Sequence, residues 1–583
     1  MPTPRQLWNK NHETILAKIK NNDETFSRVN IIFHHAYAEE GSLNYEAVMW
    51  YIRKHPNIFE EALRTNTRIN SMKIEITNEY YQYFYKGPSQ ALARAIGAMK
   101  HLRHLTIDGT YAFDEERDDI PMDVYLQNVR QISNLHFMLG NECNQVQEDA
   151  LDQALMDHPN LEIFEFEMLE AGLTLPFTTS LQTLSKLQKI CVSSYIDVTD
   201  MNPHEIFPTL WGFPALEHVP TLQEIACTLV ELDGPSAKNF ARTIENNPNL
   251  VSLDVTAPPE VLFFTNTAKA LRGKLTTLKL RVFRNMEYHE DGGGCFLEDA
   301  RSATFSFGLS YLLANMNFFG HLKVLSLLDF GWEASQLQQL QQMLEETSSL
   351  ECLSIKFQDR FSGDVYLSLA TGVGRNSTLK ELDLDWWELQ DCMSDCALSP
   401  EEFHRGNAEL VKCSTLTSYK FLGKWEDYNG CGVVCDLIYL LGVHSSFQKL
   451  ESKGRNYLYS REMSKVVDSM QTNYCLTYIN MNFCHGGKVD KELNAEAFRL
   501  DKTLQVILKL NEKGRRYMVE DRGNKNKGVA LLAQLAAEPI DYQFEDWQDA
   551  NFRYTYSPKE DIRLDCLFFH LRENPSLCDN QHL

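Results

Sequence analysis

The sequence lacks the segments that carry a chain into or across a membrane. Charged and polar residues are spread through the first 20 positions, with no uninterrupted apolar stretch of the kind a secretory signal requires. Nowhere does the chain approach the roughly 18 consecutive apolar residues that span a bilayer. The richest candidate, residues 305–319, is interrupted by Gly308, Asn315 and Asn317. These features predict a cytoplasmic protein that makes no membrane contact.

Positive charge is also in short supply. The chain has 56 basic and 80 acidic side chains and a formal net charge of −24. This excess repels phosphate backbones and favours a basic protein partner over nucleic acid.

Fourteen cysteines in 583 residues is an ordinary density. Without an export signal, reduced thiols are expected rather than a disulfide framework.

Motifs for catalysis are missing as well. The sequence contains no G-x-S-x-G, H-E-x-x-H or G-x-x-x-x-G-K-[ST] pattern and no kinase signature set. It therefore predicts no enzyme and no cofactor.

Two C-x-x-x-C pairs, Cys392/Cys396 and Cys431/Cys435, flank Cys413. Zinc binding by these thiolates is an alternative interpretation to ordinary reduced cysteines, although the pairs would have to converge from different repeats.

A repeated apolar pattern runs through most of the chain. Leu250, Leu253 and Val255 follow the L-x-x-L-x-L spacing of a leucine-rich repeat. Strong further copies are Leu322/Leu325/Leu327, Leu350/Leu353/Ile355 and Leu379/Leu382/Leu384. Weaker copies are Leu102/Leu105/Ile107, Ile132/Leu135/Phe137, Leu161/Phe164/Phe166, Leu187/Ile190/Val192, Leu222/Ile225/Cys227, Leu275/Leu278/Leu280, Leu416/Tyr419/Phe421, Leu476/Ile479/Met481 and Phe447/Leu450.

The period of this pattern indicates what lies between the copies. Leu250 follows Leu222 by 28 residues, and Leu504 follows Leu476 by the same number. A repeat of this length has room for a strand, a turn and a full helix. Residues 334–350 agree, because four apolar residues stand at helical spacing with Gln and Glu opposite: Leu337, Leu340, Met343 and Leu344.

With this alternation the chain resembles the ribonuclease-inhibitor-like class of leucine-rich-repeat proteins. The resemblance implies an α/β fold, a solenoid shaped as a curved horseshoe with parallel strands on the concave face and helices on the convex face. The tail, with Gly514–Tyr517 and Asp565–Leu571, is similar to the ending of a set of uncharacterised algal leucine-rich-repeat proteins. No activity comes with that second resemblance.

Three domains are expected. Residues 1–67 form an N-terminal helical cap, with helices within 45–53 and 58–63, because the open end of a solenoid needs cover. The repeat array occupies 68–510, with an insertion near 282–318 that contains the glycine-rich loop Glu290–Gly294. Residues 511–583 form a C-terminal cap or tail, in which 539–562 reads as a surface loop.

Candidate partner-binding residues are those that alternate with the buried leucines on each strand and so face the concave side. An alternative is that these charges only balance one another and keep the face hydrated. Trp387 is included because a ring at the concave rim could anchor a partner. The set is Glu165, Glu167, Asp254, Lys279, Arg281, Lys356, Glu381, Asp383, Asp385, Trp387, Lys420, Asn480 and Asn482.

The function predicted from these features is a protein-binding scaffold or inhibitor without catalytic activity. Two alternatives stay open. One is an adaptor or regulatory subunit for a ubiquitin-type or small-GTPase system, and the other is an enzyme or metal-binding protein with its site in the insertions. The sequence sets neither the identity of the partner nor the oligomeric state.

Overall fold

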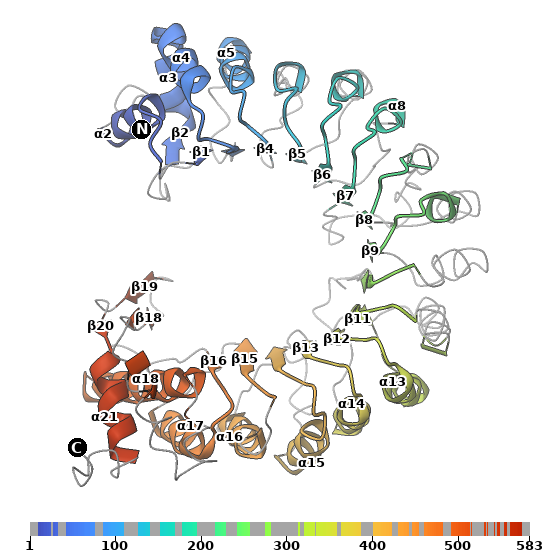
Figure 1. Cartoon of the computed structure of the whole chain (residues 1–583), viewed down its shortest axis with the longest axis vertical. Coiled ribbons are helices and arrows are strands. Elements are labelled where there is room, and N and C mark those ends of the chain that lie inside the picture. Colours follow the sequence, from blue (N-terminus) through green and yellow to red (C-terminus); the bar gives the residue numbers. More distant parts are fainter. Residues whose placement is uncertain are drawn as a thin grey trace, which may run out of the picture. The chain divides into compact units, whose positions relative to one another are not determined.

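A computed structural model describes the repeat strands together with helices between them (Figure 1). The described residues are 10–24, 27–32, 42–75, 86–109, 126–139, 152–168, 178–194, 216–217, 219–228, 242–256, 274–281, 310, 313–314, 320–330, 332, 334–357, 363–385, 400–422, 430–441, 446–453, 460–481, 491–513, 515, 530–531, 533–534, 541–542, 545–548, 553–556 and 560–573. The chain divides into two compact units, Met1–Thr304 and Phe305–Leu583.

The first unit is built on one parallel sheet with the strand order β10-β9-β8-β7-β6-β5-β4-β3-β1-β2. Its strands are β1 (Arg28–Ile32), β2 (Ser42–Asn44), β3 (Ser71–Glu75), β4 (His104–Gly109), β5 (Asn134–Leu139), β6 (Ile163–Met168), β7 (Lys189–Ser194), β8 (Glu224–Thr228), β9 (Ser252–Thr256) and β10 (Thr277–Arg281). The helices among its described residues include α2 (Lys10–Lys20), α3 (Tyr45–Lys54), α4 (Pro56–Thr65), α5 (Lys86–Gly97) and α8 (Thr178–Leu181).

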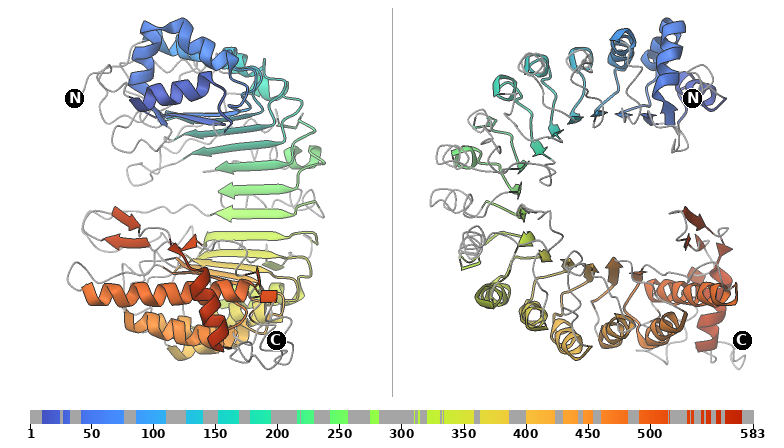
Figure 2. Two further views of the ribbon diagram at one scale, coloured as in Figure 1. Left: turned by 60° about the vertical axis from the view of Figure 1, so that its left-hand side comes forward. Right: turned by 180° about the vertical axis from the view of Figure 1, so that it is seen from behind.

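The second unit repeats the arrangement with the strand order β16-β15-β14-β13-β12-β11. These strands are β11 (Val324–Phe330), β12 (Cys352–Phe357), β13 (Glu381–Asp385), β14 (Ser418–Leu422), β15 (Lys449–Lys453) and β16 (Tyr478–Met481). Between and after them lie α13 (Ala334–Glu346), α14 (Gly363–Arg375), α15 (Pro400–Leu410), α16 (Gly430–Leu441), α17 (Ser460–Thr472) and α18 (Lys491–Glu512). In each unit the strands line one side and the helices the other (Figures 1 and 2).

The apolar pattern explains this layering. Every described side chain at the predicted anchor positions is at most 5% exposed, from Leu102 in β4's repeat to Ile479 in β16. The anchors of neighbouring strands are level with one another in the parallel register, and those described are buried. The predicted leucine-rich-repeat solenoid of parallel strands and helices is confirmed. None of the helices among the described residues is long and apolar enough to cross a membrane.

Buried asparagines join each helix end to the preceding repeat. Asn66, Asn376 and Asn473 each stand three residues before the first anchor of a repeat and are at most 3% exposed. In each case Nδ2 donates to a backbone carbonyl of an earlier helix, α2, α13 or α16, at 2.8, 2.7 and 3.0 Å respectively. Each Oδ1 accepts the backbone N–H groups two and three residues later, at 2.7–3.0 Å. One side chain thus satisfies backbone groups that the turn leaves unpaired.

Other residue types replace asparagine at this position in some repeats. His158 places Nε2 2.9 Å from the carbonyl oxygen of Leu126. Cys413 points its thiol at the carbonyl oxygen of Asn376, with an Sγ–O distance of 3.3 Å. Different residue types at this position can therefore link successive repeats, provided that a buried polar group reaches a backbone carbonyl of the preceding repeat.

At both ends of the array the strands and helices differ from the predicted ones. β1 and β2 belong to the same parallel sheet, so the segment expected to be a helical cap also contributes strands beside α3 and α4. Leu504, which the 28-residue spacing from Leu476 predicts to be the start of a repeat, lies inside α18. The L-x-x-I spacing of residues 504–507 also fits one helical turn, and the buried run there follows the helical period.

The C-terminal tail packs on the last helix of the array. α21 (Arg563–Glu573) and α18 enclose a small core of Val506, Leu510, Leu531, Ile562 and Cys566. Residues 539–562, predicted as a surface loop, instead contain the antiparallel pairs β18 (Glu545–Gln548) with β19 (Arg553–Tyr556) and β17 (Asp541–Tyr542) with β20 (Glu560–Asp561). The acidic and aromatic alternation of this segment suits strands as well as it suits an irregular loop.

Arg515, which belongs to the tail motif Gly514–Tyr517, holds neighbouring elements together. Its guanidinium is buried, donates to the carbonyl oxygen of Gln471 at 2.9 Å, and lies 4.7 Å from the ring centroid of Tyr474. It also lies 5.5 Å from the ring centroid of Phe569 in α21. This arginine therefore connects α17, the end of α18 and α21.

We expect the substitution Asn376→Ala to lower the free energy of unfolding by about 2–4 kcal/mol, because it leaves buried backbone donors and acceptors without partners. The control is Asn246→Ala, which removes one exposed contact to Glu217 at 3.2 Å and should cost less than about 0.5 kcal/mol. Urea denaturation followed by circular dichroism measures both. Equal midpoints for the two variants would contradict the role assigned to the buried asparagine.

Candidate binding face

Parallel register places the outward-facing side chains of the second unit in straight rows across the strands. We call the first residues of the strands the edge row: Val324, Cys352, Glu381, Ser418, Lys449 and Tyr478. Two positions further along lies the middle row: Ser326, Ser354, Asp383, Lys420, Glu451 and Asn480. After another two positions lies the far row, whose described side chains are Leu328, Lys356 and Asp385.

Strand β13 presents acid at all three of its outward positions, Glu381, Asp383 and Asp385. Lysines lie beside it on both neighbouring strands. Lys420 on β14 places Nζ 2.7 Å from Oδ2 of Asp383, and Lys356 on β12 is level with Asp385. The structure thus brings five of the residues predicted for the binding face into one charged patch.

A groove of about 520 Å³ follows the edge and middle rows over β11–β15. Its floor is the strand face itself, and its lining is mainly polar and charged. The lining residues are Val324, Leu325, Cys352, Leu353, Ser354, Glu381, Leu382, Asp383, Thr417, Ser418, Lys420, Gln448, Lys449 and Glu451.

The charges in this groove differ in whether they already have a partner. Asp383 and Lys420 neutralise each other. Glu381 and Lys449 are exposed and Glu451 is half-buried, and among the described residues none of these three has an ion pair. Glu381 accepts a hydrogen bond from the Cys352 thiol. Three ionised groups in the groove are therefore open to a ligand.

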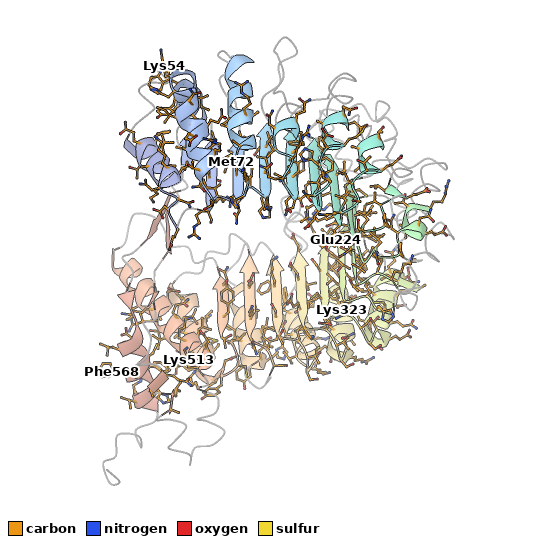
Figure 3. The ribbon with its side chains drawn as sticks, turned by 45° about the horizontal axis from the view of Figure 1, so that its top comes forward. Lys54, Met72, Glu224, Lys323, Lys513 and Phe568 are labelled. Carbon is orange, nitrogen blue, oxygen red and sulfur yellow. The ribbon has the colours of Figure 1, made fainter. Side chains whose placement is uncertain are left out.

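The equivalent face of the first unit has more complete charge pairing. Lys189 on β7 places Nζ 2.6 Å from Oε1 of Glu165 on β6, and this hydrogen bond raises the pKa of the lysine. His136 on β5 places Nε2 3.4 Å from Oε1 of Glu167. The contact with His136 lowers the pKa of Glu167 against the opposing effect of burial. Figure 3 shows these strands side by side, with Met72 of β3 and Glu224 of β8 labelled.

Further cross-strand pairs continue along this unit. Lys279 on β10 lies 3.4 Å from Asp254 on β9, and Arg281 stands level with Thr256 of β9. Sequence reasoning did not single out Lys73, whose Nζ lies 2.7 Å from Glu75 and 3.7 Å from Asp108. Several residues expected to meet a partner are thus engaged with one another, as the charge-balance alternative supposes.

Some predicted residues cannot be placed. Trp387, Asn482, the loop Glu290–Gly294 and the cysteines at 392 and 396 lie outside the described residues, and Cys431 lies in α16 with its side chain outside the description. Asn480 lies on β16 and is exposed. Of the remaining two cysteines, Cys413 is buried against backbone carbonyls and Cys435 lies in α16. Within the described ranges no cluster of His, Cys, Asp or Glu has the makings of a metal site.

Lys449 and Glu451 are the charged groove residues that sequence reasoning missed. Their repeat is the weakest copy, because Ser452 occupies the third anchor position after Phe447 and Leu450. The spacing of the two remaining anchors still fixes which residues face outward. Applying the alternation to this incomplete copy would have identified both.

Burial, followed by the charge and hydrogen bond of Glu381, raises the pKa of the Cys352 thiol to about 11. Because only the thiolate reacts, alkylation of Cys352 at pH 8 should be roughly 100-fold slower than for a thiol with a pKa near 9. The rate should keep rising to about pH 11. Mass spectrometry of iodoacetamide-treated protein measures it, with the denatured chain as control. A plateau below pH 9 would refute this assignment.

Comparisons with known proteins do not assign this chain to a family. No protein-family model and no curated protein matches the sequence. Among solved structures, a tropomodulin C-terminal domain from Caenorhabditis elegans is 15% identical, with 32% of this chain and 99% of that chain covered and a TM-score of 0.22. Leiomodin-1 actin-binding site 2 is 12% identical, with 33% and 81% covered and a TM-score of 0.19.

Proposed function

We propose that this chain is a protein-binding scaffold or inhibitor without catalytic activity of its own, and that the strand face of the second unit is its contact surface. The observation that supports the proposal is the groove over β11–β15, where Glu381, Lys449 and Glu451 have no ion-pair partner in the part of the chain that the structure describes. Ionised groups on a rigid sheet face can select a complementary partner without further ordering of the side chains.

The form and charge of the groove suit a protein segment better than a small ligand. Small-molecule sites are concave and mostly apolar, with a few polar groups, whereas this groove is lined largely by polar and charged side chains along five strands. With an overall charge of −24, the chain attracts partners of basic character from a distance. The acidic residues of β13 would then hold a basic group of the partner.

Two finer assignments belong to the same proposal. The repeats of strand followed by full helix, as in β12, α14 and β13, favour the ribonuclease-inhibitor-like class of the leucine-rich-repeat fold. A cytoplasmic location fits the free thiols of the seven cysteines whose side chains the structure describes.

The test is affinity capture from native lysate with two charge-reversed variants of the full chain. Glu381→Lys with Glu451→Lys changes the groove. Glu346→Lys with Asp468→Lys makes the same charge change on exposed positions of α13 and α17, on the helix side. We expect the groove variant to retain at least about tenfold less of a stoichiometric partner, since a lost charge contact costs more than about 1.4 kcal/mol at a desolvated interface.

Circular dichroism must first show that all three proteins are folded. Retention of the same partner by wild type and both variants would place the contact surface elsewhere, in the tail or the insertions. Loss from the helix-side variant alone would assign binding to the convex helices instead.

A further inference from the structure

The free charges of the edge row have a spacing that restricts what can bind them, provided that the strand face is the contact surface proposed above. Glu381 on β13 and Lys449 on β15 stand in the same row, separated by Ser418 on β14. Neighbouring strands lie about 4.8 Å apart, so the two positions are about 9.6 Å apart across the face. A ligand that meets both charges must carry groups of opposite sign at that separation, on one side.

Few regular backbones provide this spacing. In an extended strand, residues on one side recur every second position at about 6.8 Å, and residues three apart point to opposite sides. An α-helix brings same-side groups to about 5–6 Å over one turn and to about 10.8 Å over two turns, so one turn falls short of the separation and two turns exceed it by about 1.2 Å. In a polyproline II helix every third residue returns to the same side, with a rise of about 3.1 Å per residue and therefore about 9.3 Å per turn. This repeat matches two strand spacings.

The next position in the edge row supports the same ligand. Tyr478 on β16 is level with Lys449, and its side chain is 42% exposed. Grooves that bind polyproline II segments present aromatic rings, on which proline residues pack. A proline beyond the residue that contacts Lys449 would lie over this ring. The middle row adds no competing free cation, because Lys420 is paired with Asp383.

We propose that the edge row binds a proline-rich segment of a partner protein in the polyproline II conformation, in which a basic and an acidic residue stand three positions apart. The basic residue pairs with Glu381 and the acidic residue pairs with Lys449. Because a polyproline II segment is stiff before it binds, little conformational entropy is lost on docking.

Fluorescence anisotropy with labelled synthetic peptides tests this on the full chain. The matching peptides carry Arg-Pro-Pro-Glu or Glu-Pro-Pro-Arg within flanking prolines, so that either direction of binding is covered. The comparison peptides carry Arg-Pro-Glu, with the spacing shortened by one residue, and Glu-Pro-Pro-Glu, with two acidic groups. We expect at least one matching peptide to bind the wild-type chain about tenfold tighter than both comparison peptides.

A charge reversal in the groove provides the sharper control. Glu381→Lys places two cations in the edge row, so the preference should invert and Glu-Pro-Pro-Glu should bind best. Glu346→Lys on α13 carries the same charge change and should leave the wild-type order intact. Binding without spacing preference, no inversion with Glu381→Lys, or no peptide binding at all would each overturn the polyproline assignment.

The failure of this inference is separable from the failure of the proposed function. If the groove variant loses a captured partner while the peptides show no preference, the strand face binds proteins but recognises another kind of segment. If the groove variant keeps its partner and no peptide binds, both proposals fall.

Discussion

In-register pairing of parallel strands is the constraint on which the other features of this molecule depend. Each repeat buries its anchors only by packing against the repeats beside it, and the backbone ladder leaves no freedom to slide by one residue without exposing them. Buried asparagines such as Asn376 add side-chain bonds to the preceding turn. Residues far apart in sequence, such as Glu381 and Lys449, thereby come to fixed positions two strands apart.

Cross-strand pairing then decides which of the outward charges are available to a partner. An exposed pair such as Lys279 and Asp254 contributes at most about 1 kcal/mol to stability, but it uses charges that a ligand would otherwise meet. Most of the charged positions on the first unit's face belong to such pairs. In the second unit only part of the set is neutralised, and this difference favours the groove over β11–β15 as the binding site.

The sequence predicted the alternation of strand and helix because first anchors such as Leu222 and Leu250, or Leu350 and Leu379, recur about every 28 residues, which is a length typical of leucine-rich repeats. It also predicted which side chains face outward, since alternation along a strand follows directly from the anchors. The sequence could not predict which charged residues form ion pairs across strands. Insertions of irregular length separate the repeats, so the register between neighbouring strands is seen only in the folded chain. For the same reason Lys420 and Asp383 appeared as two site residues rather than one ion pair.

The errors occurred where local patterns are ambiguous. The apolar run around Leu504 fits a helix as well as a strand, and β1 precedes the first recognisable repeat copy.

The central claim is that a partner protein covers the groove. Carboxyl footprinting with a soluble carbodiimide, followed by mass spectrometry, tests this claim most directly. The claim predicts that a captured partner protects Glu381 and Glu451 from labelling while Glu346 on α13 stays reactive. Equal labelling of Glu381 and Glu451 with and without the partner would contradict it.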